Sequence, residues 1–327
     1  MKFYSRICSN ISVALGFIFF LLCPFVVNGS LPLIHRSNGP PHPATPNEVD
    51  NLKYYMTLSG NSYCDSVIPH RQWECGNCDR TSNMEIVQVF VTPKYDINAM
   101  VVRDDDMKRI ISVFRGSKTQ KNFDANGDIM LTEYKDQGPL VRVHRGFMKS
   151  YEEVAPQILP AVQEQIMKYP GYTVATTGHS LGGALATLHG LDLHELGFDA
   201  SIYSYASPRM GNIGFAKYSS ESGAPYHRIT SRRDLYVDCP IQLVNYLGYS
   251  HAGEESWIQE NDEILVCPNG LETDDCYNSD KGLRDNNNHY DYFDLKNNMD
   301  CLYQDTMVMS KAVCSFNQLL ELRFLPH

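Results

Sequence analysis

One serine stands in a setting that is typical of a nucleophile. Ser180 lies in "TGHSLGGALA", residues 177–186, where Gly178 and Gly182 flank it at a spacing of two. Glycines at this spacing allow a sharp turn from a strand into a helix, because they carry no Cβ that would block it. Such a turn exposes the hydroxyl, and the helix behind it directs N–H groups at a developing oxyanion. The alternative is a glycine-rich loop that contains a serine by chance.

A nucleophilic serine also needs a histidine as its base and a carboxylate that orients the histidine. On a turn of this kind the partners follow the serine in the order acid, then histidine. Asp234 comes directly after the β-rich run "YHRITS", and Asp238 is the second candidate for the acid. The histidines near or after these acids are His227, His251, His289 and His327. Chain order leaves both His251 and His289 open as the base.

The segments around Ser180 support the nucleophile rather than the loop. "YTVATTG", residues 172–178, predicts a strand before the turn, and "LGGALATLHGLDLHELG", residues 181–197, predicts a helix after it. Further β-rich runs are "EIVQVFVT", "AMVVR", "RIISVFRG", "ASIYSYASP", "YHRITS" and "DEILVCP". Residues 146–169 predict a long amphipathic helix that its internal prolines interrupt or kink. Alternating strands and helices favour a largely parallel sheet in one α/β domain.

The first 29 residues predict a secretory signal. Lys2 and Arg6 precede the apolar run of residues 11–27, and small residues allow cleavage before Ser30. A membrane anchor is the alternative, but the run is short, contains a proline and has no basic flank after it. We therefore expect a secreted, extracellular protein. Its proline-rich residues 30–46 are then a linker or a pro-segment.

Cysteine number and net charge narrow the classes of function. Eight cysteines remain after the signal, and an even set in a secreted chain indicates disulfides. "CGNC", residues 75–78, would also suit zinc, but no second pair of ligands is visible, so we expect no metal. A net charge of -10 argues against nucleic acid as a partner and against attraction to anionic lipid.

Many segments, in one order, resemble the fungal class 3 lipase family, whose members are secreted α/β hydrolases. The segments are "YYMTLSGNSYC", "WECGNCD", "YDINAMVVRDD", "VFRGS", "VHRGFMKSY", "TGHSLGGALA", "YASPRMGN", "RRDLYVD", "GYSHAGEESWI" and "NHYDYF". The likeness covers residues 47–303 and implies an α/β-hydrolase domain with a central, mostly parallel sheet flanked by helices. Residues 304–327 then form a helical C-terminal extension.

The resemblance also assigns the site. It implies Ser180 as the nucleophile, Asp234 as the acid and His289 as the base, and it gives His251 a structural role. The elbow itself predicts one oxyanion donor, the N–H of Leu181. A second donor is expected in the loop after the early strand "VFRGSK", and the family's pattern matches Ser117 there. Capping of a turn is the alternative role for this serine.

The disulfides follow partly from the same resemblance. It implies that Cys64 pairs with Cys301, Cys75 with Cys78, and Cys267 with Cys276. Cys239 and Cys314 are then left over. We predict that these two pair and attach the C-terminal extension to the loop of the acid.

The segment after Ser117 departs from the family. There the lipases carry a lid, an amphipathic helix with a tryptophan, whereas this chain reads "KTQKNFDANGDIMLTEY" with Phe123 at the position of the tryptophan. An interfacial helix needs a continuous apolar face, and "DANGD" breaks it. Relatives with polar lids act on soluble aromatic esters such as feruloyl esters.

These observations predict a secreted serine esterase, namely a triacylglycerol lipase that works through a Ser–Asp–His triad and an acyl-enzyme. Its partners are the acylglycerol or other ester substrate and, transiently, a lipid–water interface. We expect a monomer that needs no cofactor. A feruloyl-type esterase is the first alternative. A catalytically silent binding protein is the second, and the complete triad argues against it.

Overall fold

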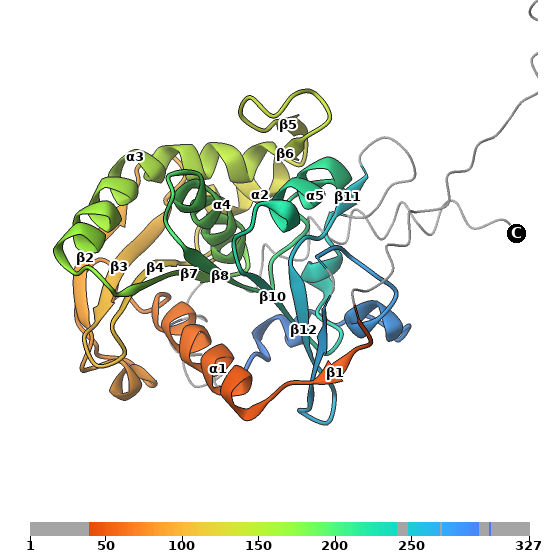
Figure 1. Cartoon of the computed structure of the whole chain (residues 1–327), viewed down its shortest axis with the longest axis horizontal. Coiled ribbons are helices and arrows are strands. Elements are labelled where there is room, and N and C mark those ends of the chain that lie inside the picture. The colour runs from red at the N-terminus through yellow and green to blue at the C-terminus, as the bar shows by residue number, and fades with distance from the viewer. Residues whose placement is uncertain (1–38, 241–247, 269, 294–300, 302–327) are drawn as a thin grey trace, which may run out of the picture. The chain divides into compact units, whose positions relative to one another are not determined.

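A mixed sheet runs through the part of the chain that the computed structural model describes, which is residues 39–240, 248–268, 270–293 and 301 (Figure 1). Its nine strands lie in the order β1-β13-β12-β10-β8-β7-β4-β3-β2. Their bounds are β1 His42–Pro43, β2 Glu85–Val91, β3 Asn98–Asp104, β4 Arg109–Phe114, β7 Thr173–His179, β8 Ala200–Tyr205, β10 Tyr226–Ser231, β12 Glu254–Ile258 and β13 Ile264–Cys267. The signal of residues 1–29 and the extension of residues 304–327 lie outside the described residues.

The middle of this sheet is parallel. β4, β7, β8, β10 and β12 pair parallel to one another, whereas β2, β3, β13 and β1 add antiparallel pairs at the two edges. β3 and β7 are buried on both faces, which suits the apolar run Ala99–Val102 in β3 and the small side chains of β7. The expected largely parallel sheet is confirmed. Ser117, Ser180 and Asp234 follow β4, β7 and β10. Because these strands are parallel, all three residues lie at the end of the sheet where the strands finish.

Helices cover the sheet on both faces (Figure 1). α1 (Pro46–Asn61) packs on β7 from one side, and α3 (Arg145–Lys168) and α4 (Leu181–Glu195) pack together on the other. Two shorter helices are α2 (Gln120–Gly127) and α5 (Ile213–Glu221). Thr45 and Glu48 form the capping box that starts α1. Just before it, β1 pairs with β13, so the last residues of the expected linker belong to the sheet.

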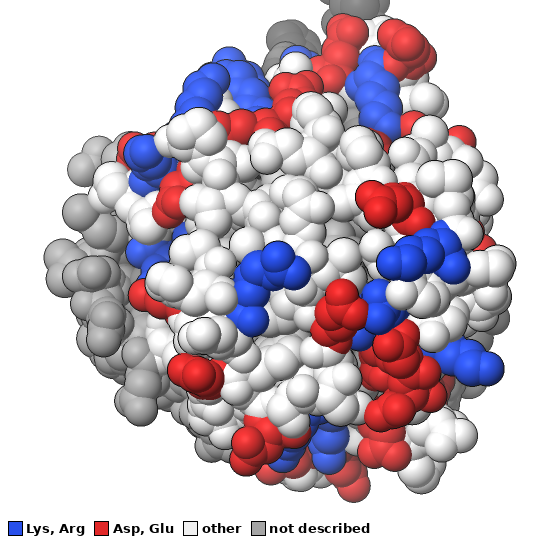
Figure 2. Space-filling model, turned by 90° about the vertical axis from the view of Figure 1, so that its left-hand side faces the viewer, with Lys and Arg blue, Asp and Glu red and all other residues white. Residues whose placement is uncertain are grey.

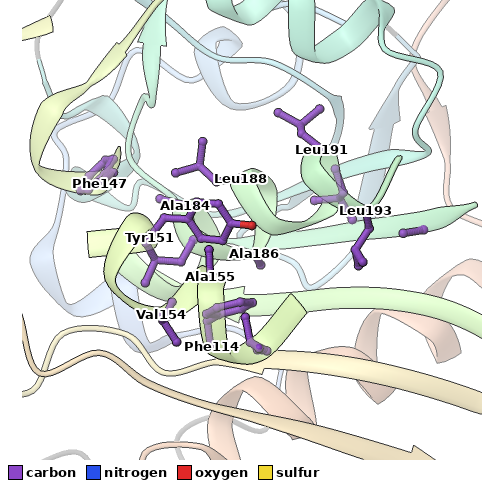
Figure 3. Packing of buried hydrophobic residues seen from close by; sticks show 14 of the residues in the cluster. Phe114, Phe147, Tyr151, Val154, Ala155, Ala184, Ala186, Leu188, Leu191 and Leu193 are labelled. Atoms are coloured by element: carbon purple, nitrogen blue, oxygen red, sulfur yellow. The ribbon is translucent and has the colours of Figure 1, made fainter. Parts of the chain in front are cut away.

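A large buried cluster includes residues of α3, α4 and β4. This cluster, shown in part in Figure 3, contains Phe147, Tyr151 and Val154 of α3, Leu188 of α4 and Phe114 of β4. α4 is apolar on nearly all sides because it lies between α3 and the sheet. The prolines of α3 do not divide it into two helices. Both lie on its exposed side, where water can bond the carbonyls that proline leaves free.

Smaller elements complete the described part of the chain. A second sheet has the order β11 (Tyr249–Ser250), β9 (Gly211–Asn212), β6 (Arg142–His144) and β5 (Leu131–Glu133). Short 3-10 helices are η1 (Cys78–Arg80), η2 (Leu235–Asp238), η3 (Cys276–Ser279) and η4 (Asn286–Tyr290). Among the described residues, no helix has the length and apolar character to cross a membrane.

On the face that Figure 2 shows, lysines and arginines are interspersed with aspartates and glutamates. No broad basic area forms there, as the net charge of -10 suggests. This face therefore lacks the electrostatic footprint that phosphate backbones require.

Candidate active site

Ser180 occupies a sharp turn between β7 and α4. Its backbone angles are φ 58° and ψ -125°, a strained combination for a residue with a side chain. Two glycines make the turn possible: a Cβ on Gly178 would lie 2.2 Å from the carbonyl oxygen of Gly182, and one on Gly182 would lie 2.1 Å from that of Phe114. The N–H of Ser180 donates to the carbonyl of Tyr205 at 2.8 Å and fixes the turn to β8.

Asp234 and His289 lie together although 55 residues separate them. Nδ1 of His289 is 3.1 and 3.0 Å from the two carboxylate oxygens. Because a carboxylate accepts, Nδ1 carries the proton and Nε2 is left as the acceptor. Asp234 is fully buried, and it also accepts from the hydroxyl of Tyr292 at 2.8 Å and from the N–H of Tyr236 at 3.0 Å. The carboxylate is therefore held in one orientation.

The other two candidates from the sequence lie elsewhere. Asp238 accepts from Arg284 at 2.7 Å and from Arg209 at 3.2 Å, so it belongs to an ion-pair network. His251 donates from Nε2 to the carbonyl of Val237 at 2.8 Å. Burial holds the pKa of His251 well below its ordinary value, so the ring is neutral.

Ser180 and His289 line the same pocket. Other residues of its wall include Tyr63, Ser117, Phe123, Ile129, Phe147, Leu181, Tyr236 and Tyr290. The wall is thus largely apolar and aromatic, with a few polar groups near the serine, as is usual for a small-molecule site. Within the described chain, no hydrogen bond yet joins Oγ of Ser180 to His289. Such bonds often tighten only when substrate binds.

Two groups beside Ser180 suit an oxyanion. Leu181 is the first residue of α4, where N–H groups have no acceptor inside the helix. Ser117 lines the pocket, and its Oγ accepts from Nδ2 of Asn126 at 2.9 Å. A hydroxyl that accepts one hydrogen bond still has its own proton to donate.

Sequence reasoning missed the residues that brace this arrangement. Besides Tyr292, the ring of His179 donates from Nε2 to the carbonyl of His289 at 2.8 Å, and its Nδ1 lies 2.9 Å from the hydroxyl of Tyr63. His179 is buried, and burial holds its pKa well below the ordinary value. Both residues belong to quoted motifs, "TGHSLGG" and "NHYDYF", but nothing in the sequence names their partners.

The polar segment after Ser117 is anchored near both ends of α2. Asn122 is buried; its Oδ1 accepts from the N–H of Thr119 at 3.1 Å, and its Nδ2 donates to the carbonyl of Tyr95 at 2.7 Å. Beyond the other end, Asp128 accepts from Nε of Arg145 at 2.8 Å.

The last turn of α2 also packs closely against the backbone of α3. A Cβ on Gly146 of α3 would lie 1.8 Å from the carbonyl oxygen of Ala125. His144, whose pKa burial lowers to about 4, lines the pocket together with Asn126. Phe123 stands between these anchors and lines the pocket.

Disulfides join Cys64 to Cys301, Cys75 to Cys78, and Cys267 to Cys276. The predicted pair of Cys239 with Cys314 falls outside the described residues, because Cys314 does. Within the described ranges, no group of three or more potential metal ligands comes together.

Comparisons with known proteins agree with this geometry. Residues 111–243 match the family described as Lipase (class 3). The chain is 41% identical to the lipase of Rhizomucor miehei over 259 residues, 77% of this chain and 70% of that protein. It is 35% identical to the lipase of Rhizopus niveus over 79% of this chain and 67% of that protein.

Solved structures give the same picture. The triacylglyceride lipase of Rhizomucor miehei superimposes with a TM-score of 0.75 at 39% identity, covering 80% of this chain and 100% of that one. A triacylglycerol lipase whose catalytic centre is described as a serine protease triad gives 0.73 at 41% identity, over 78% and 97% of the two chains. The resemblance and the α/β-hydrolase fold predicted from the sequence are confirmed, and the chain belongs to the class 3 lipase family.

Proposed function

We propose that this chain is a secreted serine esterase that hydrolyses acylglycerols. The observation that carries the proposal is the pocket that the strained Ser180 and His289 line together, with Nδ1 of His289 bound to the buried Asp234. The substrate class is suggested by the similar Rhizomucor protein, which is described as a triacylglyceride lipase.

The reaction follows from the groups in the pocket. His289 takes the proton of Ser180 through Nε2 while the hydroxyl attacks the ester carbonyl. The negative charge of Asp234 stabilises the imidazolium and keeps Nδ1 protonated. The N–H of Leu181 and the hydroxyl of Ser117 bind the oxyanion, and each donor contributes about 3 kcal/mol to the transition state. His289 then protonates the leaving alcohol, and water releases the acid.

The proposal also includes secretion and the division of the chain into a signal, a linker or pro-segment, a hydrolase domain and an extension. We keep residues 1–29 as the signal, residues 30–46 as a linker or pro-segment, and residues 304–327 as a C-terminal extension. A relative described as a secreted mono- and diacylglycerol lipase of Fusarium solani, 30% identical, supports export. The disulfides are compatible with it, because they persist in oxidising compartments.

The test is titration of fatty acid released from a tributyrin emulsion by the wild type and by Ser180→Ala. Rapid release by the wild type and none by the variant is the expected result. Release by Ser180→Ala at the wild-type rate would refute the proposed nucleophile. A wild type that is inert on tributyrin but active on soluble esters would refute the substrate class alone.

A second candidate, an esterase for soluble aromatic esters, is favoured by the anchoring of α2. The buried amide of Asn122 ties this helix to the Tyr95 turn, and Ala125 lies against Gly146 without room for a Cβ. A segment held in this way forms a fixed wall rather than a lid that an interface opens. Its aromatic member Phe123 then contributes to a pocket suited to an aromatic acid.

Rates below and above the solubility limit of tributyrin separate the two candidates, with methyl ferulate as the second substrate. No jump at droplet formation, together with rapid ferulate hydrolysis, would establish the soluble-ester activity. A steep jump would rule it out. Asn122→Ala should release α2 and create or enlarge a jump. Asn83→Ala is the control, because its amide bonds Asp106 on the surface.

A further inference from the structure

The loop that carries Asp234, which we call the acid loop (residues 232–238), has backbone carbonyls that no strand pairs. Buried carbonyls need donors, and an unpaired one destabilises its surroundings. Three side chains from elsewhere in the chain supply them. The indole Nε1 of Trp257 donates to the carbonyl of Arg232 at 3.0 Å. The other two side chains donate to the carbonyl of Asp234 itself and to a carbonyl that follows it in the loop.

The hydroxyl of Tyr277 donates to the carbonyl of Asp234 at 2.8 Å, which also accepts from the N–H of Val237 at 3.3 Å, and the same hydroxyl lies 3.2 Å from Oδ2 of Asp238. Nε2 of His251 donates to the carbonyl of Val237 at 2.8 Å. Trp257, His251 and Tyr277 are all buried. Together we call them the acid-loop clamp. Tyr277 follows directly on the disulfide between Cys267 and Cys276, which packs with Trp257 and Val237 in one small apolar cluster.

The clamp stands apart from the substrate. Its three residues are not among those that line the pocket with Ser180. Two of them belong to "HAGEESW", residues 251–257, a motif that takes no part in the proposed reaction. Glu255 of the same motif pairs with Arg228 at 3.0 Å and so ties β12 to β10, which leads into the acid loop.

We propose that the acid-loop clamp positions the catalytic acid. Hydrogen bonds from His289, Tyr292 and Tyr236 orient the carboxylate of Asp234. The position of the carboxylate, however, depends on the backbone of the acid loop that carries it. The clamp fixes that backbone before, at and beyond Asp234. Its members are positioning residues, and they influence turnover only through Asp234.

This inference rests on the proposed function, since it takes Asp234 as the acid of a hydrolase. It makes a kinetic statement that a purely structural role would not. A displaced acid impairs proton transfer and leaves the pocket wall intact, so kcat falls while KM stays the same. Misplacement by 1 Å costs about 100-fold in rate, and a partial shift about tenfold.

The test measures kcat and KM on soluble p-nitrophenyl butyrate, with thermal unfolding alongside. Tyr277→Phe removes the shorter of the two hydrogen bonds to the Asp234 carbonyl, together with the contact with Asp238, and keeps the ring. Tyr151→Phe is the matched control, because it removes a buried hydroxyl that bonds Asp192 at 2.7 Å, away from the pocket. We expect a similar loss of Tm in both, and a kcat between about tenfold and about 100-fold lower only in Tyr277→Phe.

His251 provides a second pair, which decides the matter if Tyr277→Phe does not fold. His251→Gln retains a donor near the place of Nε2 and should restore most of the kcat that His251→Leu loses. Unchanged kcat in Tyr277→Phe, or equal kcat in the two His251 variants, would overturn the clamp. An increase in KM alone would do the same.

Asp234→Asn separates this failure from failure of the proposed function. If Asp234→Asn keeps wild-type turnover, Asp234 is not the acid, and the proposed function falls first. If Asp234→Asn is inactive and the clamp variants are fully active, only the clamp is refuted.

Discussion

The turn at Ser180 and the acid loop are built in opposite ways. The turn is a run of five residues, 178–182. Its shape depends on neighbouring backbone atoms that can come close only because Gly178 and Gly182 have no Cβ. The acid loop is shaped by side chains from distant segments, including Tyr277 and Tyr292. A site can therefore combine a part that is specified locally with a part that exists only after the chain has folded. Substitutions in the locally specified part should cause large losses of activity or stability. Substitutions among the distant side chains that shape the acid loop should cause smaller, graded losses.

Ser180→Ala tests the local part at its chemical centre. Removing the hydroxyl leaves the glycines and the backbone of the turn in place, so kcat should fall by about a million-fold with the fold retained. Ester turnover and circular dichroism of the purified variant provide the measurement. Loss of the folded spectrum would mean that the side chain also holds the turn together.

Asp234→Asn tests the assembled part. The amide keeps the shape of the carboxylate but allows the wrong His289 tautomer, so kcat should fall by about ten-thousand-fold. Asp238→Asn is the control, since Asp238 pairs with Arg284 and Arg209 rather than His289. A larger kinetic effect from Asp238 than from Asp234 would reverse the proposed assignment of the acid.

Gly182→Ala asks how abruptly the turn fails. Its Cβ would lie 2.1 Å from the carbonyl oxygen of Phe114, which is backbone and cannot rotate away. We expect a loss of about 3 kcal/mol in the free energy of unfolding, measured with urea. Gly127→Ala is the matched control, because its Cβ meets nothing within 4 Å. Equal stability of the two variants would argue against a backbone-imposed turn.

Tyr292→Phe probes the gradual response of the assembled part. Oδ2 of Asp234 would keep its bond to His289 and lose only the hydroxyl at 2.8 Å. Because one hydrogen bond to a charged group contributes about 1.5 to 3 kcal/mol, kcat should fall by about tenfold. Steady-state kinetics on a soluble ester measure this effect. A loss as large as that of Asp234→Asn would show that the acid does not respond by degrees.

The same division explains what the sequence could predict. The turn, the parallel sheet and the family follow from short contiguous patterns, such as Gly178 and Gly182 around Ser180. Chain order alone left His251 and His289 open, since their difference lies in what each ring contacts. His179 and Tyr292 lie in recognisable sequence motifs. The contact of His179 with the His289 carbonyl and that of Tyr292 with Asp234 arise only in the tertiary structure. The anchoring of α2 by Asn122 is non-local in the same way.

The disulfide between Cys64 and Cys301 has a topological consequence. It closes a ring of chain whose ends are separated by 237 in sequence, and this ring contains Ser117, Ser180, Asp234 and His289. A protease that cuts one exposed loop inside this ring opens it without separating two fragments. The nicked protein loses no fragment, and every group of the site stays covalently tethered to the others until a second cut or a reductant releases a piece.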